Sequence, residues 1–175
     1  MTKRAILLEA LASTPPDVVR LVRGLDETAA VQQTDGGWSC YDVVAHLAHS
    51  EPLYLTRLQR ILAENEPVLA DPHPNGVVRD PDRPIAAVAD CFWNVRRVTL
   101  DWLREISAAD WQRPAIHETH GRTTLRFLVQ NLVAHDIEHT SQLALILGHL
   151  PAKQRADDKA LSQRREDASA PEVGP

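Results

Sequence analysis

The sequence contains few of the residues that favour a disulfide-stabilised scaffold or an all-β fold. Its 175 residues include 2 cysteines, 7 glycines and only 5% aromatic side chains. Small disulfide-rich domains have a much higher cysteine density, and this composition gives little sign of a β-rich architecture. We therefore interpret Cys40 and Cys91 as buried thiols rather than a disulfide framework, and we expect helices to dominate the fold.

Blocks of basic residues and long apolar runs are also missing. The formal net charge is -5, and the 19 lysine and arginine residues form no cluster. Nucleic-acid binding depends on clustered positive charge, so we expect no nucleic-acid partner. No segment approaches the roughly 18–20 apolar residues of a membrane span, and Glu9 interrupts the apolar stretch near the N-terminus. We expect a cytoplasmic protein without a membrane segment.

Hydrophobic periodicity predicts four long helices in one domain. The chain length fits a single domain, and apolar residues recur at helical spacing in four regions. These regions are residues 3–25, 39–65, 85–106 and 123–148. Four amphipathic helices bury their apolar stripes most simply as a four-helix bundle, so we predict an all-α fold over residues 1–150.

Prolines and capping residues indicate where these helices begin, bend or break. Pro15 and Pro16 predict an interruption of the first helical region, and Pro52 predicts a kink in the second. Ser39 and Thr123 are the expected N-caps of the second and last helices, because a hydroxyl there accepts a hydrogen bond from the first turn.

The remaining segments are expected to be irregular. Residues 66–84 contain five of the 12 prolines, which predicts a long surface loop between the second and third long helices. Residues 107–122 are predicted to form an irregular connection. Residues 151–175 contain five basic and five acidic side chains with few apolar ones. Such a composition predicts a disordered C-terminal tail.

Polar side chains occupy the apolar stripe of the last helix. His135, His139 and Gln142 take successive positions where leucine or valine is expected. Two imidazoles at i and i+4 lie on one helical face and can present their nitrogen atoms to one ion, as in helical zinc sites. The alternative is a pair of buried histidines that bond to facing side chains. We favour a metal site, which requires a third ligand from another helix.

The second helix offers two candidates for that ligand. At about 100° per residue, His46 lies roughly 110° from the centre of the apolar face and His49 roughly 170° from it. We therefore predict that His46 points inward and that His49 is a solvated surface residue. His117 and His120 lie in a connection, where they either rim a pocket or, as we expect, contact solvent.

The pattern resembles the DinB-like (YfiT-like) metal-binding four-helix bundle superfamily. The resemblance covers residues 5–150 and is carried by segments 37–39, 43–51 and 135–143. In that family the first histidine falls eight positions after a tryptophan that precedes serine, here Trp38, and an i, i+4 pair lies in the last helix. The role of metal ligand therefore carries over to His46, His135 and His139. His49 stands where the family often has aspartate and inherits no ligand role.

The resemblance also implies an activity and partners. It implies a bound divalent ion, nickel or zinc, frequent homodimers and, in some members, transfer of a low-molecular-weight thiol to an electrophile. We therefore expect a metal-dependent thiol S-transferase that acts on small electrophiles. The alternatives are a metal-dependent hydrolase and a non-catalytic metal-binding or interaction module. Three neutral imidazoles leave a coordination position open, which is typical of catalytic sites.

Two other metal chemistries fit the sequence less well. His135, Glu138 and His139 match the inverted zinc-protease motif, but those enzymes need another ligand well downstream, where only a short segment follows. A di-iron bundle needs Glu-x-x-His on two helices, and this motif does not occur in the sequence. Glu138 and Gln142 remain candidates for contacts with a ligand histidine or a substrate.

Overall fold

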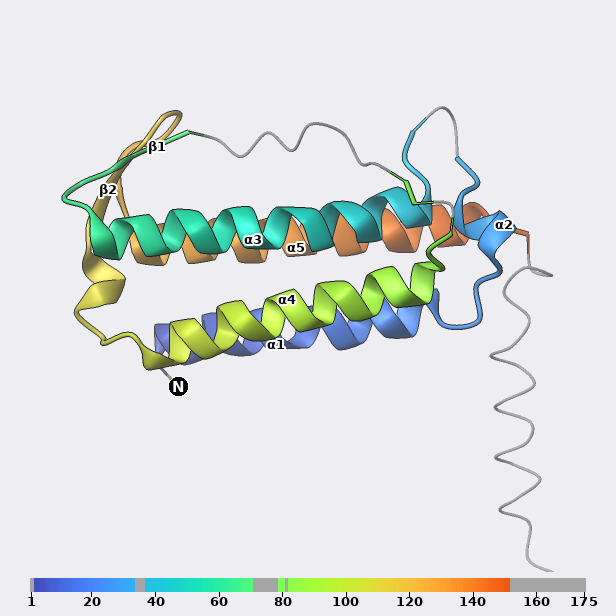
Figure 1. Ribbon diagram of the computed structural model, residues 1–175, viewed down its shortest axis with the longest axis horizontal. Coiled ribbons are helices and arrows are strands. Elements are labelled where there is room, and N and C mark those ends of the chain that lie inside the picture. Colours follow the sequence, from blue (N-terminus) through green and yellow to red (C-terminus); the bar gives the residue numbers. More distant parts are fainter. Residues whose placement is uncertain (1, 34–36, 71–78, 81, 152–175) are drawn as a thin grey trace, which may run out of the picture.

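The computed structural model describes residues 2–33, 37–70, 79–80 and 82–151, which form a helical bundle. The long helices are α1 (Lys3–Val22), α3 (Cys40–Ala63), α4 (Ile85–Glu105) and α5 (Leu125–His149), and the short ones are α2 (Glu27–Ala30) and the 3-10 helix η1 (Asp110–Gln112). In Figure 1, α3 and α5 form one layer and α1 and α4 form the other. The predicted fold class is confirmed.

Helix α1 runs without a break through Pro15 and Pro16, so the predicted interruption is wrong. A proline at position 15 lacks the N–H that would bond to the carbonyl of Leu11 in a regular helix. That carbonyl instead accepts a hydrogen bond from Arg96 Nη1 of α4, at 3.1 Å. A neighbouring helix thus satisfies the group that the proline leaves free. Helix α3 likewise continues through Pro52.

The predicted N-cap of α3 is correct, and that of α5 is one residue away. Ser39 Oγ accepts from the backbone N–H of Asp42, whose carboxylate accepts from the backbone N–H of Ser39, so the two form a capping box. At α5 the cap is Thr124, whose Oγ1 accepts from the N–H of Phe127 at 3.3 Å. Thr124 is the last residue of strand β3 and directly precedes α5, so the cap lies one residue after Thr123.

A small sheet covers one end of the bundle and was not predicted. Its strands are β1 (Val68–Leu69), β2 (Pro114–His117) and β3 (Gly121–Thr124). Strands β2 and β3 form an antiparallel hairpin, and β1 adds parallel to β2 with Val68 opposite Ile116. The expected loop and irregular connection therefore contain strands, which are too short to show an alternating pattern. Residues 71–78 and 81 of that loop, and the predicted tail beyond residue 151, lie outside the described residues.

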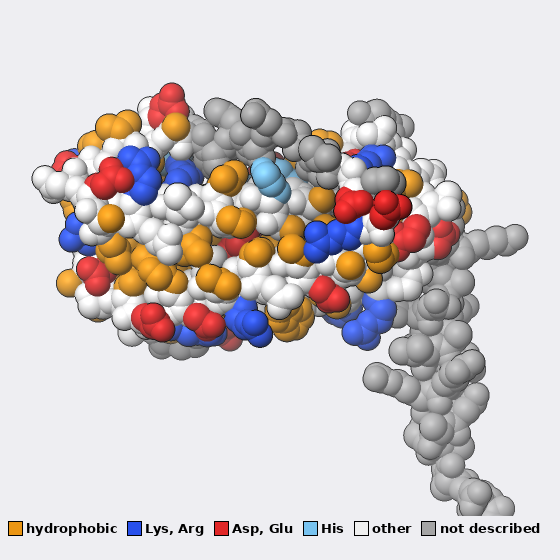
Figure 2. Space-filling model, viewed as in Figure 1, with side chains coloured by type: hydrophobic (Ala, Val, Ile, Leu, Met, Phe, Trp, Pro, Cys, Tyr) orange, Lys and Arg blue, Asp and Glu red, His pale blue; other side chains and the backbone are white. Residues whose placement is uncertain are grey.

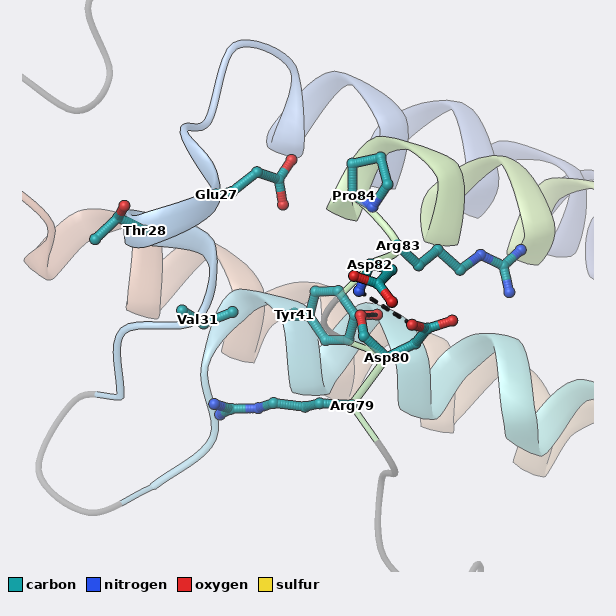
Figure 3. A pocket seen from close by; sticks show the side chains of 9 residues that line it. All are labelled: Glu27, Thr28, Val31, Tyr41, Arg79, Asp80, Asp82, Arg83 and Pro84. Carbon is teal, nitrogen blue, oxygen red and sulfur yellow. Dashed lines mark hydrogen bonds between the residues drawn. The ribbon is translucent and has the colours of Figure 1, made fainter.

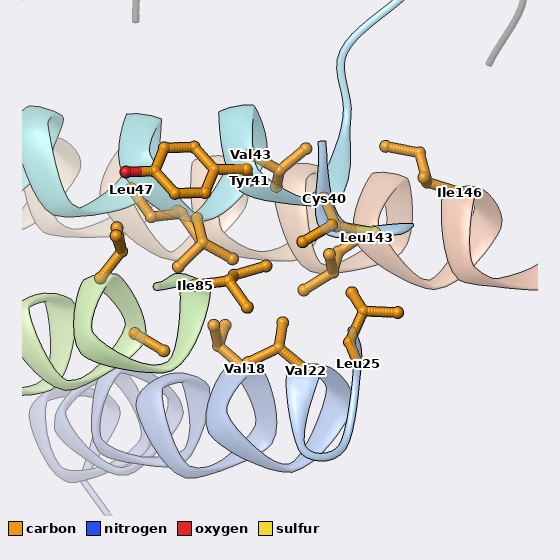
Figure 4. Packing of buried hydrophobic residues seen from close by; sticks show 14 of the residues in the cluster. Val18, Val22, Leu25, Cys40, Tyr41, Val43, Leu47, Ile85, Leu143 and Ile146 are labelled. Atoms are coloured by element: carbon orange, nitrogen blue, oxygen red, sulfur yellow. The ribbon is translucent and has the colours of Figure 1, made fainter. Parts of the chain in front are cut away.

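The apolar core consists of two clusters at opposite ends of the bundle. One gathers α2 and the adjoining ends of the four long helices (Figure 4). The other lies near the sheet. Along α5, buried residues 125–132 belong to the cluster near the sheet and residues 143–150 to the other. The segment between them carries His135, Asp136 and His139, so a polar layer separates the two clusters. None of the described helices is apolar over a stretch long enough to cross a membrane.

Candidate metal centre

Three histidines from two helices converge in the polar layer. His46 projects from α3, and His135 and His139 project from consecutive turns of α5. One candidate ligand atom from each of the three rings lies within 4.8 Å of the other two. The Nε2 atoms of His46 and His135 are only 3.0 Å apart. The structure thus brings together the three histidines that the sequence analysis selected.

Two aromatic side chains enclose these rings. The Trp38 ring stacks on the His139 ring with centroids 5.6 Å apart and planes only 4° from parallel, and its centroid lies 4.9 Å from that of His46. The Tyr54 ring lies 5.4 Å from the His135 ring. Trp38 directly precedes Ser39, the N-cap of α3, and packs against the neighbouring apolar cluster. The aromatic contacts restrict the rotation of all three imidazoles.

The environment keeps two of the histidines uncharged. Burial, reinforced by repulsion from His139, lowers the pKa of His46 from its ordinary value of 6.5 to about 4. Burial also lowers the pKa of His135 to about 3, with further contributions from His139, His46 and Arg96. Both rings are therefore neutral at pH 7. A neutral imidazole carries the nitrogen lone pair that a metal ligand needs.

Hydrogen bonds further define which ring nitrogens have a lone pair available for a metal ion. His139 Nδ1 lies 2.9 Å from Gln142 Oε1, and because an amide oxygen only accepts, this nitrogen donates. The lone pair of His139 is then on Nε2. His135 Nδ1 is buried and has no hydrogen-bond partner among the described residues, and this leaves Nε2, beside His46, as the inward-facing nitrogen. Glu138, the other predicted contact residue, is exposed.

This donor set fits a divalent metal ion. Zinc and nickel both accept neutral imidazole nitrogen, and converging ligands from two rigid helices are the usual form of metal sites in helical bundles. The Nδ1 bond from His139 to Gln142 is of the kind that orients metal-bound histidines. The three histidines, with Gln142, are therefore a candidate metal centre.

An ionic network beneath the histidines was not predicted. Arg96 of α4 donates from Nη2 to Glu51 Oε2 at 2.7 Å, and from Nη1 and Nη2 to the two carboxylate oxygens of Asp136 at 2.5 and 2.8 Å. All three side chains are at most 3% exposed. The apolar periodicity of residues 85–106 gave no sign that Arg96 is buried, because a charged side chain is not expected in an apolar stripe.

The other histidines that the structure describes are not part of this cluster. His49 is exposed, as the helical angles predicted, and His120 is exposed as well. His117 was also expected to contact solvent, but it is only 2% exposed and lies with Nε2 3.1 Å from Arg57 Nη2. Its position in β2 explains the difference, because the hairpin packs this side chain against α3.

The two cysteines differ from each other. Cys40 is buried as predicted, and burial raises the pKa of its thiol to about 11. A thiol with such a pKa is a poor nucleophile at neutral pH. Cys91 is only half-buried, so the prediction of a buried thiol is wrong there.

A hollow of about 650 Å³ lies beside α2 and α3 (Figure 3), apart from the three histidines. Its lining residues are Glu27, Thr28, Val31, Tyr41, Arg79, Asp80, Asp82, Arg83 and Pro84. Several of their polar groups are already engaged. The Arg79 guanidinium bonds to Asp42, and Glu27 accepts from the N–H of Ile85. The three converging histidines are therefore the stronger candidate for chemistry.

Comparisons with known proteins agree with this architecture. The chain is similar to the solved structure of YfiT from Bacillus subtilis, described as a probable metal-dependent hydrolase with an unusual four-helix bundle topology, with a TM-score of 0.66 and 21% identity over 85% of this chain and 90% of that one. It is also similar to the DinB-like protein YjoA from Bacillus subtilis, with a TM-score of 0.57 and 14% identity over 83% of this chain and 94% of that one. No curated protein matches the sequence. The sequence model of the DinB superfamily matches residues 10–143, and the chain therefore belongs to the DinB superfamily.

Proposed function

We propose that the protein binds one divalent metal ion, nickel or zinc, through His46, His135 and His139 and acts as a thiol S-transferase on small electrophiles. The observation that carries the proposal is the convergence of three imidazoles within 4.8 Å, two of them held neutral by burial. The ligands bring no negative charge of their own. An ion bound there lowers the pKa of a thiol or a water molecule beside it, which gives a nucleophile at neutral pH.

The protein's own side chains have defined parts in this mechanism. The three imidazoles hold the ion through nitrogen lone pairs, and Gln142 keeps His139 in the tautomer that leaves Nε2 free. Trp38 and Tyr54 fix the ring orientations and cover the histidines with apolar surface. This cover limits competition by water. It favours a polarisable thiol, which sheds its hydration more readily than a hydroxide does.

Elemental analysis tests the metal site directly. Protein prepared without a metal-affinity tag should contain about one divalent ion per chain, and His139→Ala should reduce this content to a small fraction. The matched control is His49→Ala, which removes an exposed imidazole from α3 and should leave the content unchanged. Full metal retention in a His135→Ala, His139→Ala double variant contradicts the site.

The same proteins test the activity. Metal-loaded protein should accelerate the conjugation of glutathione, bacillithiol or mycothiol to a chromogenic electrophile such as 1-chloro-2,4-dinitrobenzene, with a rate proportional to metal content. His139→Ala should lower this rate to that of metal-free protein, and His49→Ala should not change it. If no thiol is conjugated over a broad panel of electrophiles, the transferase proposal is wrong.

A hydrolase is the second candidate function, favoured by the likeness to YfiT, which is described as a probable metal-dependent hydrolase. Water would then take the place of the thiol at the same three histidines. The two activities separate in one assay, because a hydrolase turns over ester or amide substrates without added thiol. A non-catalytic metal-binding module would retain the ion and show neither activity.

A further inference from the structure

In the buried Arg96 network all four long helices meet through polar groups. Arg96 of α4 binds Glu51 of α3, Asp136 of α5 and the carbonyl of Leu11 in α1. The Leu11 carbonyl is available because Pro15 has no N–H to offer it. The chain thus positions a guanidinium at the centre of the bundle, between the two apolar clusters.

Stability alone is a poor explanation for this arrangement. Removing three charged groups from water costs free energy that their mutual attraction repays only in part, and apolar replacements of buried ion clusters are often equally stable. The network is also unbalanced, because one guanidinium faces two carboxylates and leaves a formal charge of -1. Glu51 Oε1 is buried and has no hydrogen-bond partner among the described residues. An excess buried negative charge calls for a nearby positive one.

The candidate metal centre adjoins this network along α3 and α5. Asp136 follows the candidate ligand His135 in the chain. Glu51 follows Ser50, whose Oγ lies 3.3 Å from His46 Nε2. His135 Nδ1, the ring nitrogen other than the one beside His46, is buried without a partner among the described residues, and Glu51 Oε1 is a buried acceptor without a donor among them. Both unsatisfied atoms belong to the same polar layer.

We propose that the Arg96–Glu51–Asp136 network supplies the negative charge that the three neutral histidines lack, and that Glu51 is a positioning residue of the metal centre. This inference rests on the proposed metal site and deepens it. The network makes the centre selective for a divalent ion, because the stabilisation by a fixed charge grows in proportion to the charge of the ion. Partners beyond the direct ligands commonly alter metal affinity 10- to 100-fold.

Metal affinity of Glu51→Gln tests the proposal. This substitution keeps the size of the side chain and one oxygen that can accept from Arg96, and it changes the network from a formal charge of -1 to 0. The dissociation constants for Zn²⁺ and for Cu⁺ would be measured by competition with chromophoric chelators, on full-length protein whose folding is checked by circular dichroism. The matched control is Glu138→Gln, which removes an exposed carboxylate adjacent to His139.

The two ions distinguish a charge effect from a distorted site. If the network acts through its charge, Glu51→Gln weakens Zn²⁺ binding about 10- to 100-fold and Cu⁺ binding by only about the square root of that factor. Glu138→Gln changes the dissociation constants of Zn²⁺ and Cu⁺ by no more than about twofold, since solvent screens the charge of Glu138. An unchanged Zn²⁺ affinity, or an equal loss for both ions, overturns the proposal.

A second variant, Asp136→Asn, keeps the proposal testable if Glu51→Gln does not fold. Asp136→Asn also brings the network to a formal charge of 0 and should reproduce the same pair of fold-changes. If wild-type protein fails to bind Zn²⁺, the proposed metal site itself is wrong. If wild-type protein binds Zn²⁺ and both neutralised variants bind equally well, the metal site stands and the charge-balancing role is wrong.

Discussion

At the scale of single residues, burial gives His46 and His135 a property that solvent-exposed histidines lack. Their depressed pKa values keep them neutral well below pH 7, so their lone pairs are not lost to protons. The same burial makes protonation of these histidines unfavourable in the folded state. The features that prepare the site for a metal ion therefore also make the metal-free protein sensitive to acid.

We predict that metal-free protein loses stability between pH 6.5 and pH 5. In the unfolded chain both histidines titrate near 6.5, whereas in the folded protein they stay neutral down to about 4 and 3. Over this interval the unfolded state binds more protons, so the free energy of unfolding falls as pH falls. Each histidine contributes a loss of roughly 2 kcal/mol over these 1.5 pH units.

Urea denaturation with a chelator present, at several pH values, measures this loss. His135→Gln removes one of the two groups and should make the dependence shallower. His149→Gln, at an exposed position at the end of α5, serves as the control and should keep the wild-type slope. A free energy of unfolding that is constant between these pH values would contradict the buried, neutral histidines.

The individual site residues were predictable where the signal is local. His135 and His139 are an i, i+4 pair within an apolar stripe, and the family spacing from Trp38 selects His46. Arg96 gave no such signal, because its partners lie 45 and 40 positions away along the chain. A single sequence shows which side chains carry charge, but only the fold shows which of them share a buried layer.

At the scale of secondary-structure elements, the long periodic helices were predicted well. The short strands, and the unbroken course of α1 through its two prolines, were not. A period of 3.6 is visible over the 20 or more residues of α1, α3, α4 and α5. Strands of two and four residues leave no comparable pattern. The prolines in α1 led to a wrong prediction because the Leu11 carbonyl, which Pro15 cannot bond to, accepts a hydrogen bond from Arg96 of another helix.

The capping box of α3 provides a prediction at this scale. Ser39→Ala should lower the free energy of unfolding by about 1–2 kcal/mol, because the first turn of α3 loses a hydrogen-bond acceptor. The loss should lie at the upper end of this range, since Ser39 is fully buried and its hydroxyl also donates to Asp42 Oδ2 at 2.8 Å. Thr2→Ala at the exposed cap of α1 is the matched control and should cost less. Equal losses by urea denaturation would show that burial of the cap is unimportant.

At the scale of the whole molecule, the bundle places a polar layer between two apolar clusters, and the described residues leave a row of α5 side chains exposed. Figure 2 shows basic and acidic side chains interspersed over one face of the molecule. The outer side of α5 differs in composition. Its exposed positions between 130 and 148 carry one charged side chain, Glu138, and are otherwise Gln130, Ala134, Ile137, Ser141, Ala144, Leu145 and Gly148. Ile137 and Leu145 are 61% and 66% exposed.

We propose that this face of α5 pairs with the same face of a second copy, in a homodimer related by a two-fold axis. Small side chains along the stripe allow two helices to approach closely, and a two-fold axis places each apolar side chain against the partner's stripe. Ile137→Glu should therefore convert a dimer to a monomer, measured by light scattering coupled to size-exclusion chromatography at micromolar concentration. Val98→Glu, which adds the same charge at an exposed apolar position of α4, should leave the dimer intact. Wild-type protein that elutes as a monomer, or a dimer that Val98→Glu disrupts and Ile137→Glu does not, contradicts this interface.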